Sequence, residues 1–117
     1  MPMPLKINVE KKGDYLIVLL EGRVGGEASI TMYKEIKSLL IDDKGKNLII
    51  DFGKVDFIDS SGLGSLVAVN SHLLKQNKKL ILSAVPDNLM ELLKITNLTR
   101  ILGIAPTVGD ALKDSSQ

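Results

Sequence analysis

Two serines lie between carboxylates and glycines in one short segment of the sequence. The segment reads Asp56-Phe57-Ile58-Asp59-Ser60-Ser61-Gly62-Leu63-Gly64. Short side-chain oxygens, such as those of Asp59, Ser60 and Ser61, can accept hydrogen bonds from the unpaired N–H groups of a helix's first turn. The same end of a helix favours negative charge and can bind anions. A serine here could therefore be a helix cap, a nucleophile, a contact to a bound phosphate or the acceptor of a covalent phosphate.

The residues around Ser61 disfavour catalysis by a serine nucleophile. A nucleophile elbow reads G-x-S-x-G and needs a histidine base, whereas the residue two positions before Ser61 is Asp59. The one histidine, His72, follows on the same predicted helix, and at about 1.5 Å per residue it would lie roughly 16 Å away. No cysteine is present to act instead. We therefore expect that the chain is not an enzyme.

A phosphate-binding glycine loop is matched only in part. The segment from Gly62 to Val67 has the first two glycines of G-x-G-x-x-G, and Val67 occupies the place of the third. A partial match of this kind is a weak signal, and no G-x-x-x-x-G-K-[ST] occurs in the sequence. Nucleotide binding stays open as an alternative, and no cofactor is predicted.

Composition limits the classes of partner. The 117 residues suit a single domain, predicted over residues 1–117. A net charge of +1 and 3% aromatic residues give no case for direct binding to nucleic acid or to an anionic membrane. With no cysteine and one histidine, no metal site is expected. The N-terminus lacks a signal-peptide pattern and no apolar run could span a bilayer, so a cytoplasmic protein is predicted.

Apolar patterns predict the elements that position the serine segment. Apolar runs bounded by turn residues indicate strands, and apolar residues at i, i+3, i+4 and i+7 indicate helices. In chain order the sequence predicts a hairpin over residues 7–20 with its turn at 11–14, a helix from Glu27 to Ile41, a strand from Leu48 to Phe52, a helix from Leu63 to about Gln76, a strand from Leu80 to Ala84, a helix opened by Pro86 and running to Leu98, a strand from Ile101 to Ile104, and a helix from Pro106 to Lys113.

This order of elements predicts an α/β fold, with a mixed β-sheet of about five strands covered by about four helices. In open sheets of this kind, ligands gather where the carboxyl ends of strands meet helix N-termini. Ser61 is predicted to lie at such an edge. If the two preceding strands are neighbours, the loop from Gly22 to Gly26 should lie close to it.

The segment from Asp59 to Gly64, after a short apolar strand, resembles the signature of the bacterial anti-sigma factor antagonists, which are single STAS domains. The stretch from Leu19 to Val24 is similar to the family's second strand, and Leu80–Ser83 followed by Leu89–Leu98 is similar to a late strand and its helix. The resemblance implies a STAS-like fold and partner switching. The dephosphorylated form would bind an anti-sigma factor that is also a serine kinase, and so free a sigma factor. A serine phosphatase would reset the phosphorylated form.

The resemblance also implies roles for individual residues. The second serine of the signature is the phosphorylated one in the family, and it matches Ser61, so Ser60 is interpreted as the structural cap. The family usually has an aspartate just after the second strand, whereas this chain has Gly25 there, and Glu27 is a candidate to supply the carboxylate. We predict that Gly25 weakens or redirects the kinase reaction. The predicted partner-binding residues are Asp59, Ser60, Ser61, Gly62, Leu63, Gly64, Gly25 and Glu27.

Two other functions remain open at this point. One is a STAS scaffold within a larger signalling assembly, and large, stable homo-assemblies would be evidence for it. The other is a small nucleotide-binding or enzymatic domain, for which tight nucleotide binding without a protein partner would speak.

Overall fold

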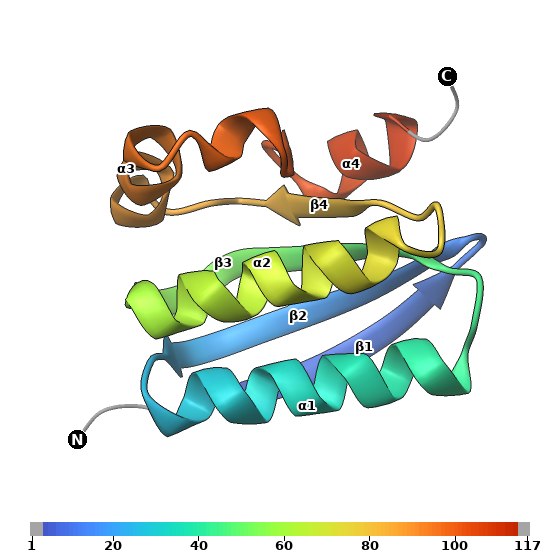
Figure 1. The fold of residues 1–117 in the computed structure, drawn as a ribbon, viewed down its shortest axis with the longest axis horizontal. Coiled ribbons are helices and arrows are strands. Elements are labelled where there is room, and N and C mark those ends of the chain that lie inside the picture. Colours follow the sequence, from blue (N-terminus) through green and yellow to red (C-terminus); the bar gives the residue numbers. More distant parts are fainter. Residues whose placement is uncertain (1–3, 115–117) are drawn as a thin grey trace.

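The protein is represented by a computed structural model that describes residues 4–114. Strands and helices alternate after an initial hairpin (Figure 1). In chain order they are β1 (Lys6–Lys12), β2 (Tyr15–Val24), α1 (Glu27–Asp42), β3 (Asn47–Ile58), α2 (Ser60–Leu74), β4 (Leu80–Ser83), α3 (Asp87–Ile95), the 3-10 turn η1 (Leu98–Arg100), β5 (Gly103–Ala105) and α4 (Val108–Asp114).

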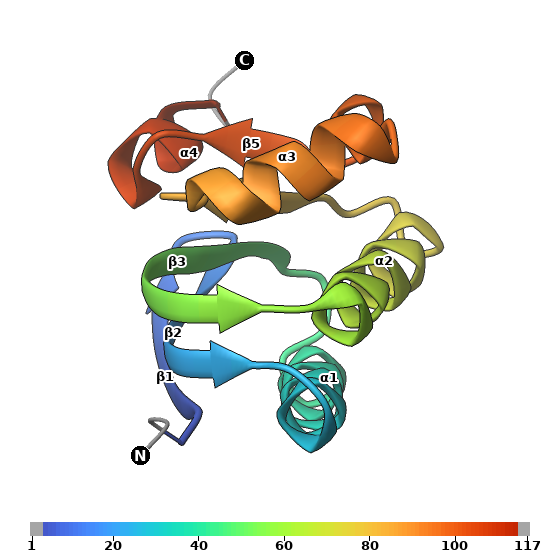
Figure 2. The same ribbon diagram turned by 90° about the vertical axis from the view of Figure 1, so that its left-hand side faces the viewer.

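The five strands form one sheet in the order β1-β2-β3-β4-β5. β1 pairs antiparallel with β2, and the pairs β2–β3, β3–β4 and β4–β5 are parallel. The helices α1 and α2 run side by side along one face of the sheet, and α4 lies on the opposite face (Figure 2). The predicted mixed sheet of about five strands covered by about four helices is therefore confirmed.

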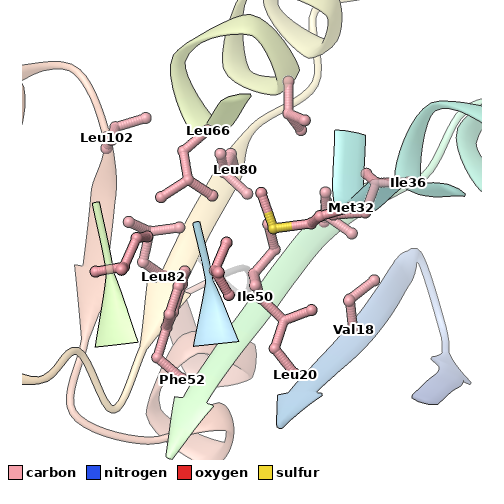
Figure 3. Packing of buried hydrophobic residues seen from close by; sticks show 14 of the residues in the cluster. Val18, Leu20, Met32, Ile36, Ile50, Phe52, Leu66, Leu80, Leu82 and Leu102 are labelled. Carbon is pink, nitrogen blue, oxygen red and sulfur yellow. The ribbon is translucent and has the colours of Figure 1, made fainter. Parts of the chain in front are cut away.

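Alternation along β2 divides the core between the two faces of the sheet, because successive side chains of a strand point to opposite sides. Leu16, Val18 and Leu20 belong to the larger cluster, which packs beneath α1, α2 and α3 and includes Met32 and Leu66 (Figure 3). Tyr15 and Ile17 belong to a smaller cluster that packs against α4. Leu, Ile and Val supply most of the larger cluster and half of the buried residues of the smaller one.

Several boundaries differ from the sequence prediction. The last strand is Gly103–Ala105 rather than residues 101–104, and β2 runs on past Leu20 to Val24. β3 continues past Phe52 to Ile58, because the pairing with β2 persists although polar residues interrupt the apolar run. The helix α2 begins at Ser60 rather than Leu63. The helix α3 ends at Ile95 because Asn97 adopts a left-handed φ of 61°, which few residues other than glycine and asparagine tolerate.

The extended pairing of β2 with β3 positions the serine segment. It reaches Val24 opposite Ile58, well beyond the last residue paired with β4. Both strands end at the edge of the sheet where α1 and α2 begin (Figures 1 and 2). The predicted proximity of the Gly22–Gly26 loop to the serine segment is therefore confirmed, and the Asp59 N–H donates to the Val24 carbonyl at 3.3 Å.

Candidate functional site

Asp59 caps the helix α2. Its backbone is extended, with φ −112° and ψ −174°, and its Oδ1 accepts a hydrogen bond from the Gly62 N–H at 3.0 Å. Ser60 is instead the first helical residue and its side chain is exposed. The interpretation of Ser60 as the structural cap is therefore wrong. The cap residue must precede the helix with a non-helical backbone, and that residue is Asp59.

The Ser61 hydroxyl is held by the same carboxylate. Ser61 Oγ donates to Asp59 Oδ1 at 2.6 Å, and the residue remains exposed. From the other side, the Gly26 N–H donates to Asp59 Oδ2 at 3.2 Å and lies 3.3 Å from Ser61 Oγ. The hydroxyl is thus oriented by one carboxylate and one backbone N–H while its outer side stays open to solvent.

Glycines allow the loop after β2 to come this close. A Cβ on Gly25 would lie 2.8 Å from Asp59 Oδ2 and 3.0 Å from the ring of Phe57. Gly26 has a φ of +54°, which a side chain would strain. Because Gly26 also stands at the N-terminus of α1, the N-termini of both α1 and α2 meet at Ser61.

Hydrogen bonds lower the pKa of the Asp59 carboxyl below its ordinary value. The largest cause is the bond from the Ser61 hydroxyl, followed by the Gly62 N–H, with a smaller contribution from Gly26. Each bond favours the charged form. Asp59 is therefore ionised at neutral pH, and it can act on Ser61 as a fixed negative acceptor.

The lowered pKa sets the sign of a pH dependence. A carboxylate whose pKa is lower in the folded than in the unfolded chain stabilises the fold above the unfolded pKa, near 3.8, and this stabilisation is lost as the pH falls through the folded pKa. Asp59→Asn can still cap α2 but carries no charge. We expect the variant to be less stable than the natural chain at pH 7 and the difference to shrink below about pH 4.

Urea unfolding of both proteins at pH 7 and at about pH 2.5 checks this expectation. A difference in unfolding free energy that stays the same at both pH values would contradict it. Asp43→Asn, which removes the partner of Lys11 at 3.1 Å far from this site, controls for the general loss of one carboxylate.

The remaining predicted site residues differ in their exposure. Gly64 is exposed and a Cβ there would meet no atom within 4 Å, whereas Leu63 is buried in the core. Glu27 is exposed in the first turn of α1. Within residues 4–114, the carboxylate that bonds the Ser61 hydroxyl belongs to Asp59, so the structure gives Glu27 no direct contact with that hydroxyl.

Two features of the site were not singled out from the sequence. One is the Gly26 N–H, although a pair of glycines just before a predicted helix is a sign of an exposed donor. The other is a link between the helices: Ser65 Oγ donates to the Ser29 carbonyl at 3.0 Å, and Ser29 Oγ donates to the Gly26 carbonyl at 2.6 Å. These bonds fix α1 against α2 just behind Ser61.

Other chemistry finds no support in the described part of the chain. His72 lies on α2 with its Nε2 3.5 Å from the Gln76 amide. Residues 4–114 contain no group of three or more His, Asp or Glu side chains arranged to hold a metal. None of the helices described is both long enough and apolar enough to cross a membrane.

Comparison with known proteins finds relatives over most of the chain. The family model of the STAS domain matches residues 6–111. An anti-sigma-B factor antagonist of Listeria monocytogenes is 28% identical over 101 residues, which cover 86% of this chain and 88% of that protein.

Solved structures share the fold. An anti-sigma factor antagonist from Mycobacterium paratuberculosis has a TM-score of 0.86 and 23% identity, covering 97% of this chain and 95% of that one. The Bacillus cell fate determinant SpoIIAA in its phosphorylated form has a TM-score of 0.75 and 18% identity, covering 94% and 99%. At these identities the likeness is one of fold.

Proposed function

The chain belongs to the STAS domain family, and we propose that it acts there as an anti-sigma factor antagonist switched by phosphorylation of Ser61. The observation that carries the proposal is the exposed Ser61 hydroxyl, held 2.6 Å from Asp59 where two helices begin. The proposed partner is an anti-sigma factor with serine kinase activity, bound by the unphosphorylated form. A serine phosphatase would remove the phosphate, and the chain itself would contact neither nucleic acid nor membrane.

The proposed modification is a phosphoryl transfer for which the chain supplies the nucleophile. Ser61 Oγ forms a bond to the γ-phosphorus of ATP in the kinase, and the bond from that phosphorus to the β–γ bridging oxygen breaks, so that ADP leaves. The hydroxyl proton passes to a base. Asp59 orients the hydroxyl through the bond it already accepts, and its low pKa suits an orienting acceptor better than a strong base.

The surroundings of Ser61 suit a close protein contact. Ser60, Ser61 and Gly64 are exposed along the first turn of α2, and Gly26 and Glu27 are exposed beside them at the start of α1. Gly64 has no neighbour within 4 Å of its would-be Cβ, which leaves room for a partner to approach the backbone. The same surface would bind the kinase when Ser61 is unphosphorylated.

The position of the phosphate tests the proposal. After incubation with the cognate kinase and ATP, phosphopeptide mapping should find phosphate on Ser61 and not on Ser60. Ser61→Ala should abolish incorporation, and Ser60→Ala, a matched change one residue away, should leave it in place. Phosphate confined to Ser60 or to another residue would overturn the proposal. Large, stable homo-assemblies with no kinase bound would instead favour the scaffold function.

The structure replaces the prediction that the absence of an aspartate at Gly25 weakens the reaction: we now expect Gly25→Asp to slow phosphorylation of Ser61 and not to speed it. A side chain at this position would start 2.8 Å from Asp59 Oδ2, so it displaces the carboxylate that orients the hydroxyl, and its own charge repels Asp59. Initial rates of phosphate incorporation measure the effect. Gly25→Ala separates the steric part from the charge, and a faster rate in Gly25→Asp would contradict the expectation.

A further inference from the structure

The strand β1 forms one edge of the sheet, and its outer side is unpaired. All of its residues, from Lys6 to Lys12, pair antiparallel with β2, and no other strand of residues 4–114 lies beside them. In Figure 2 β1 lies at the lower left, at the end of the sheet away from β5. An unpaired edge exposes a row of N–H and C=O groups that can pair with a further strand.

An apolar groove runs along this edge on the side of α1. Successive side chains of a strand point to opposite faces of the sheet, and Ile7 and Val9 point to the face that α1 covers. They line the groove together with Glu35, Ser38 and Leu39 of α1. Val9 is 37% exposed, so the described part of the chain leaves the groove uncovered. A strand added at the edge would bring its own side chains against Ile7 and Val9.

The sequence of β1 is complementary to itself. Two identical strands that pair antiparallel are related by a two-fold axis, and with the axis at Asn8 each residue meets the one equally far beyond position 8 in the other copy. Lys6 of each copy then lies opposite Glu10 of the other, and Ile7 lies opposite Val9. Opposite charges and apolar pairs directly across an antiparallel pair are both stabilising.

The adjacent registers towards the C-terminus lose this match. With the axis at Val9, Lys6 would meet Lys12, and with the axis between positions 8 and 9 it would meet Lys11. Like charges directly opposite each other are destabilising. Charged side chains commonly protect an edge strand in this way, whereas the register about position 8 pairs them with opposite charges. Lys11 is in addition held on the α1 side by Asp43 at 3.1 Å.

We infer that the chain forms a symmetric dimer through β1, in which the two strands pair antiparallel about Asn8 and the two sheets become one. The contact is small beside a standard stable interface of about 1,600 Å², so the dimer is expected to be weak and to depend on concentration. The edge and the groove include no residue of α2, so Ser61 stays open in both copies.

Sedimentation velocity and ¹⁵N–¹H spectra of the full chain over a dilution series test the dimer. Between about 20 µM and about 1 mM, a range that suits a weak complex, we expect the sedimentation coefficient to rise with concentration. The amide shifts of residues 6–10 should change with the same concentration dependence, and that of Gly26 should not. A chain that stays monomeric over this range, or a dimer whose shifts spare β1, would overturn the inference.

Charge reversal at Lys6 and Glu10 tests the register. Lys6→Glu and Glu10→Lys each place like charges opposite each other at both ends of the contact, so each should weaken the dimer about tenfold or more. The double variant restores the opposite pairs and should dimerise like the natural chain. Lys75→Glu, at the exposed C-terminal end of α2, is the matched control and should leave the dimer unchanged.

An equal mixture of the two single variants repeats this test without a double change in either chain. In the inferred register one variant presents acidic side chains at positions 6 and 10 and the other presents basic ones, so the mixture should dimerise although each variant alone does not. A double variant and a mixture that both stay as weakly associated as the single variants would overturn the inference.

Discussion

Ser61→Asp is expected to remain folded and to bind the anti-sigma factor kinase a hundredfold to a few thousandfold more weakly than the natural chain. Burying an uncompensated charge under a partner costs on the order of 3–5 kcal/mol, and each 1.4 kcal/mol is about tenfold in affinity. Asp59, fixed 2.6 Å from Ser61 Oγ, adds like charge and strengthens the effect. The N-termini of α1 and α2 partly compensate the charge within the free protein, by up to about 2 kcal/mol, so the fold should persist.

Ser61→Ala should bind the kinase constitutively, because it is neutral and cannot be phosphorylated. Titration calorimetry of both variants, with circular dichroism to check the fold, measures the difference. Ser38→Asp introduces the same change on an exposed part of α1 roughly 18 Å along the helix from the site, and it should bind like the natural chain. Equal affinities of the two Ser61 variants, or loss of the fold in Ser61→Asp, would rule out an electrostatic switch.

Gly62→Ala and Gly64→Ala are expected to change stability in opposite directions although the glycines are two residues apart. A Cβ on Gly62 would lie 2.6 Å from Ile58 Cγ1 and 2.7 Å from the Val24 carbonyl oxygen, whereas a Cβ on Gly64 would meet nothing within 4 Å. Overpacking of this kind costs about 1–3 kcal/mol. An alanine in an open helical position stabilises by up to about 1 kcal/mol relative to glycine.

Urea unfolding of the two variants measures both effects. Gly62→Ala should lower the midpoint and Gly64→Ala should raise it slightly, with similar dependence on urea concentration. Each glycine variant controls for the other, since the chemical change and the helix are the same. Equal midpoints would contradict the structural reason given for Gly62, which is that α2 starts in direct contact with the ends of β2 and β3.

The strands and helices could be predicted from the sequence, because the spacing of apolar residues indicates them. The proximity of Ser61 to the Gly22–Gly26 loop could also be predicted, because parallel neighbouring strands end at the same edge of the sheet. The strand β3 was cut short in the prediction at Phe52. Gly53 and Lys54 are exposed and interrupt the apolar run, and only the pairing with β2 shows that the strand continues. Local pattern carries no information on such long-range pairing.

The cap residue and the contacts around Ser61 could be determined only from the structure. Asp59 and Ser60 are both good cap residues by type, and the choice of Asp59 rests on its extended backbone. Gly25 marks a missing carboxylate in the sequence, but its contact with Asp59 shows that the space beside Ser61 is already taken. Nothing in the sequence distinguishes Tyr15 from other strand residues. That its buried hydroxyl has no hydrogen-bond partner among the described residues is shown only by the structure.

The most direct test of the proposed switch compares the chain phosphorylated at Ser61 with the unphosphorylated chain. The phosphate carries about −1.5 to −2 charges at neutral pH. Both forms, verified by intact mass, are titrated with the anti-sigma factor kinase by calorimetry, and their circular dichroism spectra are compared. We expect superimposable spectra, an affinity at least about a hundredfold lower for the phosphorylated form, and recovery after phosphatase treatment. Equal affinity of the two forms would contradict it.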